Sequence, residues 1–149
     1  GIRTLALRYA NVYGPRQNAA GEAGVVAIFA HRLVTGSLAV INGDGEQTRD
    51  YVFVDDVAEA NQRALERHDL SGAMNIGTGI ETSVNELFRQ LARAADARAA
   101  ARHGPPKPGE QRRSALDSSL AKRLLDWTPR VSLDEGLRRT VDYVQRASE

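Results

Sequence analysis

Short β-prone segments alternate with amphipathic helical segments along this chain, and the alternation limits its fold more than any other feature. Apolar and β-branched residues predict strands over residues 4–13, 38–41, 51–54 and 73–76. Strands that alternate with helices are typical of α/β folds with some parallel pairing. The sequence therefore predicts an α/β fold, with too few strands for a complete doubly wound sheet.

The first two helices are marked by apolar spacing and by their end signals. Residues 25–33 carry apolar side chains at helical spacing, and Gly36 stands where a C-cap glycine is expected. Asp55 and Asp56 predict the N-cap and first turn of a helix over residues 56–67. Helix capping also explains this acidic pair better than a catalytic carboxylate dyad does.

Later in the chain, two S-x-x-E capping boxes at residues 83–86 and 132–135 predict the starts of two more helices. A short helix around residues 120–124 is predicted between them, capped by Asp117 or Ser118. Irregular structure is predicted for the polar segment 16–23 and for the segment 99–115, which is rich in Pro, Gly and Arg.

Composition excludes several classes of function. The net charge of +1 gives no global field for nucleic acid or an anionic membrane, and the chain has no cysteine for disulfides or thiolate metal sites. Its apolar runs fall short of the ~20 residues that span a bilayer. The three histidines lack metal-ligand spacing. We therefore expect a cytoplasmic protein of one domain without a metal, a nucleic-acid partner or a membrane partner.

No self-contained catalytic constellation is visible in the sequence. Gly77-Thr78-Gly79 follows a strand and precedes a helix, but Thr82 replaces the third glycine of a dinucleotide-binding turn. An acidic ribose ligand about 20 residues later is also missing. No tyrosine is followed four residues later by lysine, a pair that would supply a general base. We predict a plain strand-to-helix turn at residues 77–79 and no catalytic residue.

Four ordered segments, at residues 7–17, 43–57, 75–79 and 125–129, resemble the extended short-chain dehydrogenase/reductase family of NAD-dependent epimerases and dehydratases. Within that family, bacterial UDP-glucose 4-epimerases are the most similar. The resemblance implies that the predicted strands 4–13 and 73–76 are the last two strands of a Rossmann-type parallel sheet. It also implies that the rest of residues 1–149 is the small α/β substrate-binding domain.

The same resemblance implies an N-terminal NAD-binding domain with the glycine-rich turn and the catalytic Tyr/Lys pair. A strand so close to residue 1 predicts that this domain is absent from the chain. We therefore expect the nucleotide-sugar-binding half of an NAD-dependent UDP-hexose 4-epimerase, inactive alone, with NAD held mainly by the other half. Alternatives are half of a dTDP- or UDP-sugar dehydratase or decarboxylase, and a non-catalytic nucleotide-binding module.

Four polar residues are expected to contact a UDP-sugar from the family register. Arg49 is expected to bind the diphosphate through its planar fork, the alternative being a surface ion pair with Asp50 or Glu46. Asn11, expected just past the end of a strand, offers an amide to phosphate or sugar hydroxyls, the alternative being turn capping.

Lys107 and Glu110 are expected at the α-phosphate and the ribose hydroxyls, unless their segment is only a solvated basic loop. The family usually has arginine at the position of Lys107, so Arg112 or Arg113 is an alternative cation.

The remaining expected contacts also come from the resemblance. Val40 and Asn42 are expected to line the uracil edge through their backbone, and Val25 to close the pocket. Tyr9 and Val12 are expected near the nicotinamide end of NAD. If the neighbouring domain is absent, the edge of strand 4–13 exposes unpaired amides, and such an edge favours self-association.

Overall fold

A computed structural model describes residues 2–20 and 24–148 of the chain. Its elements are, in order, β1 (Leu5–Tyr9), β2 (Asn11–Tyr13), α1 (Val25–Val34), β3 (Val40–Asn42), β4 (Thr48–Arg49), β5 (Tyr51–Phe53), α2 (Val54–Leu65), β6 (Gly72–Ile76), β7 (Thr82–Ser83), α3 (Val84–Ala94), β8 (Arg102–Gly104), α4 (Ser119–Leu125) and α5 (Leu133–Ala147).

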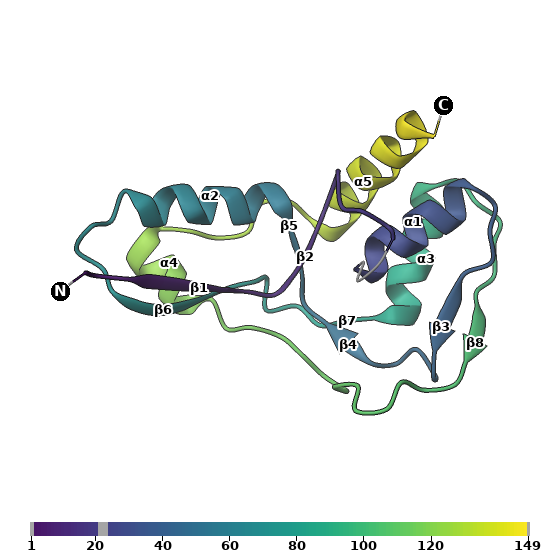
Figure 1. The fold of residues 1–149 in the computed structure, drawn as a ribbon, viewed down its shortest axis with the longest axis horizontal. Coiled ribbons are helices and arrows are strands. Elements are labelled where there is room, and N and C mark those ends of the chain that lie inside the picture. Colours follow the sequence, from purple (N-terminus) through teal and green to yellow (C-terminus); the bar gives the residue numbers. More distant parts are fainter. Residues whose placement is uncertain (1, 21–23, 149) are drawn as a thin grey trace.

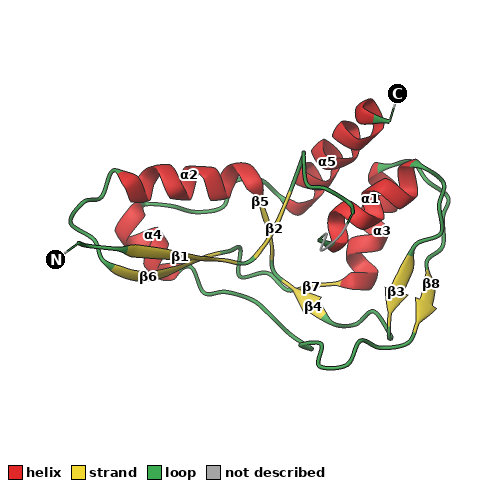
Figure 2. Ribbon diagram, viewed as in Figure 1, coloured by secondary structure: helices red, strands yellow, loops and turns green. Residues whose placement is uncertain are grey.

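The molecule is elongated, with one group of elements at each end (Figure 1). The pair β1–β6 lies with α2 and α4 at one end, where an apolar cluster surrounds the fully buried Trp127. Helices α1, α3 and α5 pack together at the other end around a second cluster, beside the pair β3–β8. Strands β2 and β5 cross between the two groups, as the colouring by secondary structure makes clear (Figure 2).

The α/β class predicted from the sequence is confirmed. Strands β1 and β6 pair in parallel from Leu5 opposite Gly72 to Tyr9 opposite Ile76. They are the two strands expected at the end of a Rossmann-type sheet.

The prediction of one continuous strand over residues 4–13 is wrong, because the backbone changes partner at Ala10. The Ala10 N–H donates to Ile76 O at 2.9 Å, whereas the Asn11 N–H donates to Asp50 O at 2.8 Å. From there β2 pairs in parallel with β5. The apolar pattern of residues 4–13 continues across Ala10 without a break, so the sequence does not indicate that the strand changes its pairing partner there. As a result Asn11 opens β2, whereas the sequence places it past the end of a strand.

Three short strands were not predicted. β8 lies within the segment 99–115 and pairs in parallel with β3, so the prediction of irregular structure is wrong there. β4 and β7 form an antiparallel pair that sets Arg49 opposite Thr82. All three are held by partners distant in sequence, and none carries an apolar alternation of its own.

The helix starts predicted from the two S-x-x-E sequences are confirmed, with Ser83 and Ser132 as the N-caps of α3 and α5. Ser83 Oγ accepts the Glu86 N–H, and Ser132 Oγ accepts the Glu135 N–H, each at 3.2 Å. The predicted C-terminal glycine of α1 is confirmed as well. Gly36 has a φ of 64°, and the Ser37 N–H donates to Arg32 O at 2.8 Å, as in a Schellman motif.

The prediction that Asp55 or Asp56 is the N-cap of α2 is wrong, since the N-cap is Phe53 and both acids lie in the first turn. Asp56 is buried and accepts the backbone N–H groups of Arg130 and Val131 at 3.0 and 3.1 Å. Asp56 therefore fastens the segment before α5 to α2, which explains the acid better than capping does.

At α4 the N-cap is Ser118, and the preceding Asp117 carboxylate accepts the Ser119 N–H at 2.8 Å. Residues 16–20 form turns and loops as predicted, while residues 21–23 of that predicted loop lie outside the described part. Among the described helices, none has both the length and the apolar character to cross a membrane.

Candidate functional site

A cavity of about 370 Å³ lies between α1, β3, β4 and the segment that carries residues 107–110. One part of its wall is apolar and the other part is polar. Apolar side chains of α1 and β3, including Ile28, Phe29 and Ile41, line one part, and charged or amide side chains line the other. An apolar pocket with a few converging polar groups is the usual form of a small-molecule site.

The cavity brings together every residue that the sequence assigned to substrate. Seven residues from β2, α1, β3, β4 and the segment after β8 line it: Asn11, Val25, Val40, Asn42, Arg49, Lys107 and Glu110. These residues span almost a hundred positions of the sequence, so only the fold can place them around one volume.

The two residues expected near the nicotinamide lie elsewhere. Tyr9 is 45% exposed on β1, and its hydroxyl donates to Asn61 Oδ1 of α2 at 2.9 Å. Val12 packs against the apolar cluster of Trp127. Neither borders the 370 Å³ cavity. Their contact with NAD stays a prediction.

Arg49 is held by backbone carbonyls before any ligand is considered. Its Nη1 donates to Thr48 O at 2.8 Å and to Gln111 O at 2.7 Å, and its Nη2 donates to Glu110 Oε1 at 3.2 Å. The side chain is 17% exposed. A guanidinium has five N–H donors, so these three bonds leave the Nε hydrogen and one Nη2 hydrogen for a ligand.

The alternative partners proposed for Arg49 are engaged elsewhere in the described residues. The carboxylate of Asp50 accepts hydrogen bonds from residues 78, 79 and 116, and Glu46 accepts one from Asn85. Arg49 pairs instead with Glu110, across the cavity wall.

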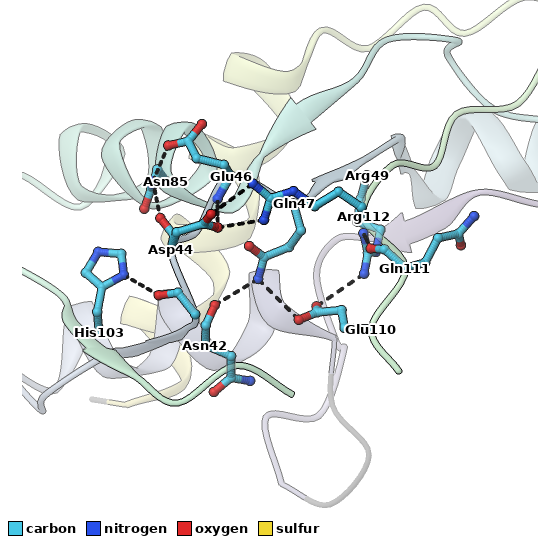
Figure 3. A network of polar contacts seen from close by, with 11 residues as sticks. Asn42, Asp44, Glu46, Gln47, Arg49, Asn85, His103, Glu110, Gln111 and Arg112 are labelled. Carbon is cyan, nitrogen blue, oxygen red and sulfur yellow. Dashed lines mark hydrogen bonds and ion pairs between the residues drawn. The ribbon is translucent and has the colours of Figure 1, made fainter. Parts of the chain in front are cut away.

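Gln47 and Tyr51 line the same cavity, and the sequence reasoning missed both. Gln47 Nε2 donates to Asn42 O at 3.0 Å and to Glu110 Oε2 at 3.3 Å (Figure 3). Both residues fall within the family-like segment 43–57, and this resemblance is the feature of the sequence that could have identified them as site residues. Their importance comes from burial, which the sequence does not show.

Burial raises the pKa of the Tyr51 phenol to about 12, with a smaller upward contribution from Glu110 and a downward one from Arg49. Among the described residues its hydroxyl oxygen is buried without a hydrogen-bond partner. Tyr51 is therefore a neutral phenol at physiological pH, located beside the Arg49–Glu110 pair.

The segment after β8 is tied to the rest of the site by two exposed bidentate ion pairs. Arg112 donates to both carboxylate oxygens of Asp44 at 2.8 and 2.9 Å, and Arg113 holds Glu81 at 2.6 and 2.9 Å. These guanidinium hydrogen bonds lower the pKa of each carboxyl to about 2. Because both forks are occupied, the two arginines are poor substitutes for Lys107 as a phosphate ligand.

The glycine turn at residues 77–79 has its amides occupied from within the chain. Asp50 is 1% exposed, and its carboxylate accepts the N–H groups of Thr78 and Gly79, both at 2.9 Å. A Cβ added to Gly77 would lie 2.5 Å from Asp50 Oδ2. The turn therefore packs against Asp50 and leaves no cradle for a pyrophosphate.

Comparison with known proteins shows which family and which proteins this chain is similar to. A sequence profile of the NAD dependent epimerase/dehydratase family matches residues 1–77. A UDP-glucose 4-epimerase of Mycolicibacterium smegmatis is 48% identical over 140 residues, which cover 94% of this chain and 45% of that protein.

Two solved structures extend the likeness to three dimensions. The UDP-glucose 4-epimerase of Thermotoga maritima, crystallised with UDP-glucose, is 50% identical with a TM-score of 0.94, over 97% of this chain and 47% of that one. The UDP-glucose 4-epimerase of Thermus thermophilus, in complex with NAD, is 43% identical with a TM-score of 0.85, over 96% of this chain and 47% of that one. The chain thus spans about half the length of the relatives it matches.

Proposed function

Because the chain belongs to the NAD-dependent epimerase/dehydratase family, we propose that it is the C-terminal, nucleotide-sugar-binding half of a UDP-hexose 4-epimerase. The observation that carries the proposal is the convergence on one cavity of the seven residues that the family resemblance assigns to the substrate. The half-length match to the relatives supports the assignment to one half.

In this proposal the polar part of the cavity holds the diphosphate. The Nε hydrogen and one Nη2 hydrogen of Arg49 remain for phosphate oxygens, and charge-assisted bonds of this kind are the strong ones. Lys107 lines the same wall and adds a point charge. Asn11 at the start of β2 offers an amide to the phosphate or the sugar.

The apolar part of the cavity holds the base. Val25 from α1 and Val40 from β3 line it together with Asn42. The backbone of the last residue of β3 can pair with a uracil edge, while the valines cover the ring. Anchoring the remote nucleotide leaves the hexose free to present either face to the reacting centre, which is a use of binding energy away from the chemistry.

NAD is assigned in this proposal to the other half of the full-length relatives. The glycine turn at residues 77–79 does not fit the pyrophosphate of a dinucleotide, since the Asp50 carboxylate already accepts the N–H groups of Thr78 and Gly79. We therefore expect no turnover by the 149-residue chain alone. Purified chain is incubated with UDP-glucose and NAD, and the UDP-sugars are separated by chromatography. Measurable epimerisation would contradict the assignment.

Calorimetric titration of the chain with UDP, dTDP and GDP tests the binding function itself. We expect UDP to bind most tightly, at one site per chain. dTDP should be weaker because it lacks one ribose hydroxyl for Glu110, and GDP because its larger base meets the apolar wall. Binding of none of the three, or tightest binding of GDP, would contradict the proposal.

We also propose that the isolated chain self-associates through β1. Among the described residues β1 pairs with β6 alone. A hollow of about 420 Å³ beside it is lined by Leu5, Leu7, Leu65 and Leu70. An unpaired edge beside apolar side chains is a template for another strand, and a second copy supplies one.

A further inference from the structure

Gln47 lies at the centre of the polar network that borders the cavity (Figure 3). It is only 5% exposed, and its Nε2 donates to two acceptors, the backbone oxygen of Asn42 and the carboxylate of Glu110. Because both partners accept, the amide must present its nitrogen and not its oxygen to them. Both hydrogens of that nitrogen are thereby used.

Glu110 needs such an anchor, because it lies on an irregular segment. The backbone N–H of Glu110 donates within the same segment, to Lys107 O at 3.2 Å, and the Glu110 side chain is 27% exposed. Gln47 holds one carboxylate oxygen at 3.3 Å, and Arg49 holds the other at 3.2 Å. An ionised carboxylate has about four lone-pair sites, so about two remain for a ligand.

We propose that Gln47 is a positioning residue that aims the Glu110 carboxylate at ribose hydroxyls and so makes the site selective for ribonucleotides over 2′-deoxyribonucleotides. This inference rests on the proposed function, since it requires a nucleoside diphosphate in the cavity. Gln47 also holds the end of β3 through its hydrogen bond to Asn42 O. The same amide therefore positions both Glu110, beside the proposed ribose site, and β3, beside the proposed base site.

The Gln47→Glu variant separates positioning from packing, because its side chain has the same shape. Its carboxylate would face two acceptors, and the repulsion would turn Glu110 away. We expect the wild-type chain to bind UDP about tenfold more tightly than 2′-deoxy-UDP in calorimetric titrations, the effect of one hydrogen bond to a charged group. In Gln47→Glu this ratio should fall to about twofold or less, chiefly through weaker UDP binding.

Two further variants complete the test. Gln47→Met removes both donors without adding charge and should also collapse the ratio, so a folding defect in Gln47→Glu does not end the experiment. Gln145→Glu adds the same charge at an exposed position of α5 and should leave both affinities unchanged.

Each outcome has one meaning. Equal weakening of UDP and 2′-deoxy-UDP in the Gln47 variants, with the wild-type ratio retained, would reduce Gln47 to a packing residue and overturn the inference. A wild-type ratio near one would overturn it too, because Glu110 would then not sense the ribose. Failure of the wild-type chain to bind UDP would refute the proposed function itself. Circular dichroism of every variant checks the fold.

Discussion

Replacing Arg49 by lysine tests the diphosphate site through the geometry of one side chain. The change keeps the positive charge but removes the planar fork that reaches Thr48 O, Gln111 O and Glu110 at once. A lysine ammonium has three donors and no fixed plane, so it cannot satisfy these partners and also offer two donors to phosphate oxygens. The loss should therefore appear in ligand affinity even though the charge is retained.

One hydrogen bond to a charged group contributes about 1.5–3 kcal/mol, which corresponds to roughly a 10- to 150-fold rise in Kd for UDP. Calorimetric titration measures this change directly. Arg112→Lys is the matched control, because Arg112 lies on the same segment with its fork given to Asp44 in an exposed pair. It should change Kd by less than about threefold, since exposed pairs contribute little. Equal Kd values for wild type and Arg49→Lys, or equal effects of the two substitutions, would show that the Arg49 fork does not bind the diphosphate.

Three further predictions concern stability and assembly. Asp50→Asn should lower the free energy of unfolding by about 3 kcal/mol in urea titrations. The reason is that an amide nitrogen would replace one of the two Asp50 oxygens, and both oxygens accept hydrogen bonds. An unchanged midpoint of urea unfolding would contradict this prediction. The pKa of Glu81 is about 2 in the folded chain against 4.5 for the free group, so its pair with Arg113 should contribute fully above about pH 4.5. That contribution should vanish as the pH falls toward about 2, so wild type and Glu81→Gln should differ in stability at pH 6 and converge near pH 2. Light scattering should show that the apparent mass of the chain rises with concentration. This rise should be smaller in Ala6→Lys, which places a charge on the edge strand β1. A wild-type chain that stays monomeric at high concentration would contradict self-association through β1.

Local signals were the predictable part of the fold. The serine N-caps at Ser83 and Ser132 and the glycine after α1 follow from short-range geometry, and the structure has all three. Pairing between distant segments was not predictable in detail. The exchange of partner at Ala10 and the pairing of β8 with β3 depend on neighbours far along the chain.

The candidate site divides in the same way. The family-like segments located Arg49 and Glu110, because the residues themselves match. Gln47 lies in one of those segments but was missed, since an amide gains importance only when it is buried between two acceptors. The actual partner of Arg49 was also missed, because Glu110 lies 61 residues away in sequence.

A crystal structure of the chain with UDP would show whether the 370 Å³ cavity is the nucleotide site. We expect diphosphate oxygens within about 3 Å of the Arg49 guanidinium and ribose hydroxyls at similar distances from Glu110. The base should lie between α1 and β3. Density for UDP in the larger hollow of about 710 Å³ between α1 and α5, or a diphosphate out of reach of Arg49, would contradict it.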